Sequence, residues 1–169
     1  MRFKVWKQRL QASFCRLPMK KVGICAGIAL ILGVIIAVSG GHRYPVFYCL
    51  PKGSLPTFLI FLFWGLFFAL SGGLLGAFLF SCRYGHARTQ IILLFVFALT
   101  LSYAWIPIVY KAGCLFFGLL LSLLLCGAVG LLFISLFRYD LMFAILLIPC
   151  GMWVVYISYY TFALLLLNG

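Results

Sequence analysis

Charged side chains divide this chain into long stretches that contain none of them. Each stretch has at least 21 residues, and together they cover 22–42, 53–82, 89–110, 112–137 and 141–169. A helix of about 20 apolar residues spans the hydrocarbon layer of a bilayer. The pattern therefore predicts five membrane-spanning helices, at about residues 22–39, 57–80, 91–110, 114–137 and 141–167.

No stretch alternates polar and apolar residues with a period of two over enough strands to indicate a membrane barrel. Only helices and closed barrels satisfy the backbone hydrogen bonds of a chain in lipid. We therefore expect an all-α integral membrane protein, built as a bundle of five transmembrane helices over residues 22–169. Its first partner is the lipid bilayer.

Composition narrows the possible chemistry. The chain is 67% hydrophobic and 8% charged, with 13 Lys and Arg against one acidic residue, Asp140. A single carboxylate excludes paired-carboxylate hydrolysis and carboxylate-held metal sites. A chain with so little other polar surface offers no face to nucleic acid, despite its net charge of +12. Asp140 stands just before the fifth predicted helix, where a carboxylate caps a helix N-terminus.

The positions of the cations predict a topology. Ten lie on the side of the N-terminus, the second loop and the fourth loop, and three, Arg43, Lys52 and Lys111, lie on the opposite side. The positive-inside rule then places the N-terminus in the cytoplasm and the C-terminus outside a cell (plasma) membrane. Helical spans of this apolarity favour a plasma membrane over an outer membrane, where barrels dominate.

Residues 1–21 form a separate basic segment. Phe3, Trp6, Leu10 and Phe14 fall on one helical stripe, with most of the cations elsewhere around the helix. This pattern is typical of an amphipathic helix that lies on an anionic membrane surface. A loose polybasic tail that serves only as a topology signal fits the pattern equally well. A signal peptide fits less well, because the basic region is long and the apolar core over-length.

Small residues recur at four-residue spacing in the first two spans, at Gly23, Gly27, Gly33, Gly72 and Gly76 among others. Such residues let membrane helices approach closely. We favour packing within the bundle over a dimer face, although two such surfaces allow both.

The predicted spans contain no Asp, Glu, Lys, Arg or His, which disfavours proton-coupled pumping and charge-selective conduction. Hydroxyls supply the interior polar groups, and in helices these usually bond back to their own backbone. The seven cysteines show no Cys-x-x-Cys motif and no histidine at ligand spacing, so we expect no metal site.

Three tryptophans lie too deep in the predicted spans for an interfacial belt. Trp64, Trp105 and Trp153 stand within the second, third and fifth spans. A tryptophan at such depth favours a protein or ligand neighbour, because its N–H group needs a partner. Together the three predict a pocket for a flat, apolar ring system.

The connection over residues 40–56 carries several glycines and prolines, and it lies on the same side as the outer ends of these spans. As a lid, it would place Arg43, Lys52 or Lys111 within reach of acidic groups on a ligand. A plain connector fits the same residues.

The segment LPKGSLPTFLIFLFWGLFFALSGG resembles the TspO/MBR family, also called tryptophan-rich sensory proteins or translocator proteins, at Pro51, Pro56, Trp64 and Gly72. LTLSYAWIPIVYKAG resembles the third-span signature of that family at Ala104, Trp105 and Pro107. IPCGMWVVYISYYT resembles its fifth-span signature at Pro149, Trp153 and, less well, Tyr156.

The resemblance implies a five-helix bundle, often a homodimer, with a pocket beneath the loop between the first two spans. The implied ligands are porphyrins, haem, sterols or benzodiazepine-like drugs, and no cofactor is required. It also implies ligand-contact roles for Pro51, Pro56, Trp64, Gly72, Trp105, Pro107, Trp153 and Tyr156. The chain departs from the family pattern at Ser102, at Leu121 or Ser122, and at Thr161, where the family has Asn, Asp and Asn. These departures put in doubt a hydrogen-bond network that joins the last three spans.

Three functions follow, and we favour the first. It is binding of a porphyrin-type (tetrapyrrole) ligand by a sensor, carrier or scavenger. The second is light- and oxygen-dependent porphyrin breakdown, which the resemblance associates with Trp64 and Trp153 and which would make the protein an enzyme. The third is a structural or assembly role in the membrane without a small-molecule ligand.

Overall fold

The computed structural model of the protein describes residues 19–40, 49–52, 54–80 and 86–168, and this part of the chain contains helices and no strands. The helices are α2 (Met19–Gly40), α3 (Thr57–Leu79), α4 (His86–Tyr110), α5 (Leu115–Tyr139) and α6 (Leu141–Asn168). All five are long and apolar enough to cross a membrane. The predicted all-α membrane fold is therefore confirmed, with helix ends within a few residues of the predicted ones. The chain is a multi-pass membrane protein.

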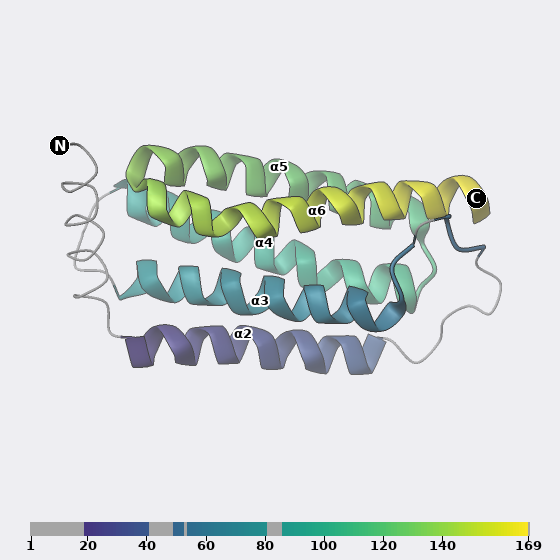
Figure 1. Cartoon of the computed structure of the whole chain (residues 1–169), viewed down its shortest axis with the longest axis horizontal. Helices are drawn as coiled ribbons and strands as arrows, with labels where there is room; N and C mark the ends of the chain where they lie inside the picture. The colour runs from purple at the N-terminus through teal and green to yellow at the C-terminus, as the bar shows by residue number, and fades with distance from the viewer. Residues whose placement is uncertain (1–18, 41–48, 53, 81–85, 169) are drawn as a thin grey trace.

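Successive helices run in opposite directions, so the connections alternate between the two ends of the bundle (Figure 1). The packed pairs are α2 with α3, α3 with α6, α6 with α5, α5 with α4 and α4 with α2, which closes a ring. A further contact between α3 and α4 runs across it. The helix order around the ring therefore differs from the order along the chain, and α3 and α6 become neighbours although α4 and α5 separate them in sequence.

The contact between α2 and α3 depends on glycine. A Cβ atom on Gly72 would lie 2.5 Å from the Cβ of Ala29 and 2.9 Å from the carbonyl oxygen of Cys25. A Cβ atom on Gly76 would lie 2.7 Å from the Cβ of Cys25. These approaches are too close for any side chain, so the glycines allow the two backbones to touch. The predicted internal packing of small residues is confirmed at these positions.

Not all of the predicted small-residue positions pack inside. Cβ atoms on Gly23 and Gly27 would meet nothing within 4 Å. The neighbouring Ile24 and Ile28 are exposed. The face of α2 that carries these four residues therefore points away from the described helices.

Two polar side chains form hydrogen bonds with backbone groups at helix ends. The Asp140 carboxylate accepts a hydrogen bond from the Met142 N–H at 3.1 Å, which confirms the predicted cap of α6. At the same end of the bundle, Arg88 donates from Nε to the carbonyl of Phe78 and from Nη2 to that of Leu79. These carbonyls lie in the last turn of α3, where a helix has more backbone acceptors than its own N–H groups can satisfy. Arg88 thus closes the C-terminus of α3.

Hydroxyls inside the helices bond mainly to their own backbone, as predicted. Ser102 donates to the carbonyl of Ala98 at 2.7 Å, and Thr161 donates to that of Ile157 at 2.7 Å. Among the described hydroxyls, Ser158 also reaches another helix, with its oxygen 3.2 Å from the Ser122 carbonyl on α5. The hydroxyls of Ser102, Ser122 and Thr161 therefore make local hydrogen bonds, and the side chain of Ser158 links α6 to α5.

Two predictions concern residues that lie outside the described part of the chain. Residues 1–18 of the basic segment lie outside the described residues, while 19–21 form the first turn of α2. Arg43 also lies outside them. The assignment of the bundle ends to the two sides of the membrane stays a prediction.

Candidate functional site

The three deep tryptophans meet in the bundle. Trp64 on α3 lies between the other two, with ring centroids 5.4 Å from Trp105 on α4 and 5.9 Å from Trp153 on α6. Trp64 is 1% exposed, Trp105 is fully buried and Trp153 is 7% exposed. The three tryptophans therefore form one cluster, which is possible because α3 packs against both α4 and α6.

Two further aromatic rings, Phe68 and Tyr103, extend this cluster toward α2. Phe68 stacks between Trp64 and Tyr103, at centroid distances of 5.4 and 4.7 Å. Tyr103 also donates its hydroxyl to the Ala29 carbonyl on α2 at 2.8 Å. Near-parallel rings at such distances are favourable beyond the area they bury. The cluster thus joins α3, α4 and α6 through aromatic contacts and α2 through the Tyr103 hydrogen bond.

The polar groups of this cluster are incompletely satisfied. The Nε1 atoms of Trp64, Trp105 and Trp153 are buried, and none has a hydrogen-bond partner among the described residues. A buried N–H group without an acceptor costs about 1–3 kcal/mol. The described protein atoms therefore provide no hydrogen-bond acceptor for three buried indole N–H groups in one cluster.

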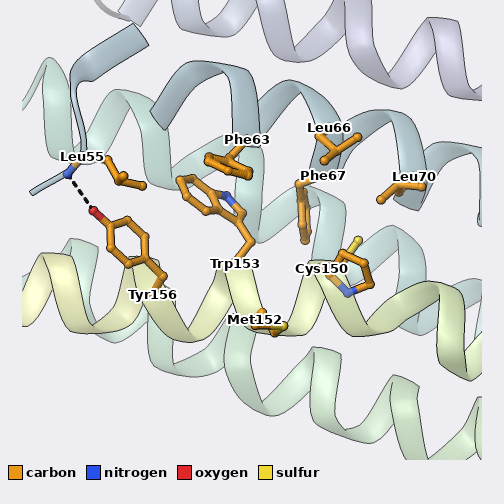
Figure 2. Close-up of a pocket in the computed structure, with 10 residues that line it drawn as sticks. Leu55, Phe63, Leu66, Phe67, Leu70, Cys150, Met152, Trp153 and Tyr156 are labelled. Atoms are coloured by element: carbon orange, nitrogen blue, oxygen red, sulfur yellow. Dashed lines mark hydrogen bonds between the residues drawn. The ribbon is translucent and has the colours of Figure 1, made fainter. Parts of the chain in front are cut away.

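A cavity of about 310 Å³ lies beside the cluster, between α3 and α6. Figure 2 shows Phe63 and Phe67 of α3 and Trp153 of α6 in the space between these two helices. The lining is almost entirely apolar, and it carries no charged side chain. The lining residues are Leu55, Phe63, Leu66, Phe67, Leu70, Pro149, Cys150, Met152, Trp153 and Tyr156.

One wall of the cavity is aromatic. The ring of Trp153 is near-parallel to that of Phe63 at 5.2 Å and to that of Tyr156 at 5.4 Å, with an interplanar angle of 25° in both pairs. At the opposite end, the Cys150 thiol lies 3.8 Å from the Ser71 hydroxyl. Phe63, Leu66 and Met152 are exposed as well as lining the cavity, so the cavity opens on the lipid-facing surface of the bundle.

A short segment before α3 closes one end of the cavity. We call residues 49–52 and 54–56 the strap. Leu55 of the strap lines the cavity, and its N–H donates to the Tyr156 hydroxyl at 3.1 Å (Figure 2). Pro51 is buried, and its carbonyl accepts a hydrogen bond from the Ser54 N–H at 3.0 Å. The strap is therefore an ordered element that contacts α6.

The structure distributes the sequence-predicted site residues over different places. Trp153 and Tyr156 line the cavity, whereas Trp64 and Trp105 pack behind Trp153 and do not. Pro107 lies within α4, and its carbonyl accepts hydrogen bonds from Lys111 and Ala112.

Pro51 and Pro56 belong to the strap, and Pro56 stands directly before α3. Gly72 lies against α2, where its role is the close approach of two helices. Lys52 and Lys111 are exposed, and neither lines the cavity.

Sequence reasoning missed most of the apolar lining. Phe63, Leu66, Phe67 and Leu70 follow helical spacing on α3, and this repeat was the only signal available. Because α3 is apolar all round, that spacing does not distinguish a cavity face from a lipid face. Within the described residues no three His, Cys, Asp or Glu side chains gather into a metal-binding group.

Five membrane-spanning helices around a buried tryptophan cluster, with an apolar cavity beside it, define a helical integral membrane protein with a pocket of small-molecule size. A family model described as the TspO/MBR family matches residues 21–167. Because the match covers nearly the whole chain, the protein belongs to the TspO/MBR family. Comparison with curated proteins found no match.

Proposed function

We propose that the protein binds a tetrapyrrole, or a similarly flat apolar molecule, in the cavity between α3 and α6. The observation that carries the proposal is the aromatic wall of Phe63, Trp153 and Tyr156. Flat rings stack favourably on such a wall, and small-molecule pockets are typically apolar with few polar groups. Family membership supports the same ligand class, because the resemblance implies porphyrins. Sensor, carrier and scavenger roles all require this binding step.

The polar groups near the cavity support a particular orientation. The Trp153 N–H lacks an acceptor in the described structure, and a carbonyl oxygen of a ligand would supply one. The walls carry no charge, so a ligand's carboxylates would stay at the strap end, where Lys52 is exposed. A buried carboxylate without a partner would be costly elsewhere along the cavity.

A titration tests this function. Protoporphyrin IX is added to the purified protein in detergent, and tryptophan emission is followed together with that of free N-acetyltryptophanamide as the optical control. We expect saturable quenching in the protein only. Trp153→Phe should weaken binding about tenfold, because it removes a stacking surface and the open N–H donor.

Tyr159→Phe is the matched control, since Tyr159 is exposed on the same helix and lies outside the cavity. It should bind as the native protein does. Quenching that rises linearly with pigment and never saturates would contradict the proposal and favour a structural role for the aromatic cluster.

Porphyrin breakdown is a second candidate function, favoured by the contact between Trp64 and Trp153, since Trp153 also lines the cavity. A pigment in the cavity would lie against an indole that touches a second indole. The complex is illuminated in air while pigment absorbance is followed. Protein-dependent loss of absorbance that Trp153→Phe abolishes supports breakdown, and loss equal to that of pigment in empty micelles contradicts it.

A further inference from the structure

Hydrogen bonds join the strap to α6 at two places. Nearest the cavity, the Leu55 N–H donates to the Tyr156 hydroxyl at 3.1 Å. Farther along α6, the Asn168 side chain makes a reciprocal pair with the backbone of Cys49. Its Oδ1 accepts from the Cys49 N–H at 2.7 Å, and its Nδ2 donates to the Cys49 carbonyl at 3.1 Å. Hydrogen bonds from α6 side chains thus hold both ends of the strap.

The Asn168 contact is fixed from its own helix. Asn168 Nδ2 also donates to the Leu164 carbonyl at 3.0 Å, so both amide atoms have partners and the side chain is oriented. Cys49 is exposed and Asn168 is half-buried. This contact lies outside the cavity lining, which makes it a second fastening that can be altered without changing the pocket.

Tyr156 has two roles at once. Its ring belongs to the aromatic wall, near-parallel to Trp153, while its hydroxyl accepts the hydrogen bond from the strap. The ring is half-buried, whereas Phe67 and Cys150 in the same cavity are buried. A movement of this ring therefore changes the cavity wall and the strap together.

We propose that Tyr156 couples occupation of the cavity to release of the strap. The inference rests on the proposed function. A cavity of about 310 Å³ is at the lower limit for small-molecule pockets. A tetrapyrrole that stacks on Trp153 needs more room, and Tyr156 is the half-buried ring beside Trp153, held to the strap by one hydrogen bond and to α6 by ring contacts. Displacing the Tyr156 ring breaks the hydrogen bond from the Leu55 N–H, so ligand binding changes the position of the strap.

Amide hydrogen exchange tests the coupling, because each fastening protects a backbone N–H of the strap. The exchange of Leu55 and Cys49 is measured by NMR on the full-length chain in micelles. In the ligand-free protein, Tyr156→Phe should speed exchange at Leu55 about three- to tenfold, as expected for loss of one hydrogen bond. Asn168→Ala should do the same at Cys49, and Tyr159→Phe should change neither.

Protoporphyrin IX at saturation should then speed Leu55 exchange in the native protein and add nothing in Tyr156→Phe. Linkage gives a reciprocal result, since a strap that is held at one end only opposes binding less. Asn168→Ala should therefore bind the pigment about two- to fivefold more tightly, although it leaves the cavity lining intact.

Saturable quenching with unchanged Leu55 exchange would overturn the coupling and leave the proposed function standing. The absence of saturable quenching would overturn the proposed function and the coupling with it. Unchanged Leu55 exchange in ligand-free Tyr156→Phe would show that the hydroxyl does not hold the strap, and this also overturns the inference.

Discussion

Gly72 offers a sharp test of how the bundle is assembled, because its two possible roles predict different results. A Cβ atom there would lie 2.5 Å from the Cβ of Ala29 and 2.9 Å from the Cys25 carbonyl oxygen. Neither neighbour is the flexible end of a side chain, so α2 and α3 must separate to admit a methyl group. Overpacking of this kind typically destabilises by about 1–3 kcal/mol.

Gly27→Ala is the matched control. Gly27 lies on α2, and a Cβ atom there would meet nothing within 4 Å. Alanine at an open helix position is favoured over glycine by about 0.5–1 kcal/mol. The control should therefore be neutral or slightly stabilising, which separates a general effect of replacing glycine from the effect of the contact at Gly72.

Thermal unfolding in detergent, followed by circular dichroism, measures the difference. For chains of this size, each 1 kcal/mol shifts the Tm by about 2–4 °C, so Gly72→Ala should unfold several degrees below Gly27→Ala. Equal Tm values would refute the packing role. Native Tm with weakened protoporphyrin binding would restore the ligand-contact role that the family resemblance implies.

Three further predictions concern single hydrogen bonds and the topology. Tyr103→Phe removes the bond to the Ala29 carbonyl. It should lower stability by about 0.6 kcal/mol, the average for such bonds between membrane helices, as measured by the same unfolding assay. Asp140→Ala removes the cap on the Met142 N–H and should cost about 0.5–2 kcal/mol, while Asp140→Asn, which retains a capping oxygen, should stay close to native. In a chain whose other cysteines are replaced, Cys49 should react with a membrane-impermeant maleimide added outside intact cells, and labelling only after lysis would reverse the predicted orientation.

The fold was predictable because the bilayer imposes a length on each helix. Uncharged stretches of the right length gave all five spans, and Asp140 correctly marked the start of α6. Small residues at helical spacing in the first two spans predicted close packing within the bundle, and at Gly72 the structure shows this packing between α2 and α3. Span length, helix capping and close helix packing each depend on the residues of one segment or of one helix pair. Each can therefore be predicted from the residues of that segment or pair.

The cavity was only partly predictable. Trp153 and Tyr156 line it, but Trp64 and Trp105 pack behind it. Depth along a helix follows from sequence position, whereas the direction of a side chain depends on how the helix is rotated against its neighbours. These helices are apolar all round, so hydrophobicity gives no indication of that rotation. The fastening of Asn168 to Cys49 joins residues 119 positions apart and has no motif that would reveal it.

Localised crosslinking tests the central claim, ligand binding between α3 and α6, most directly. A protoporphyrin derivative carrying a diazirine is bound to the protein in detergent and photolysed, and the labelled residues are mapped by mass spectrometry. Labels at residues 63–70 of α3 and 149–156 of α6, competed by unmodified protoporphyrin IX, are the predicted result. Labels that competition does not reduce, or that lie on the exposed face of α5 around Phe116 and Phe117, would contradict it.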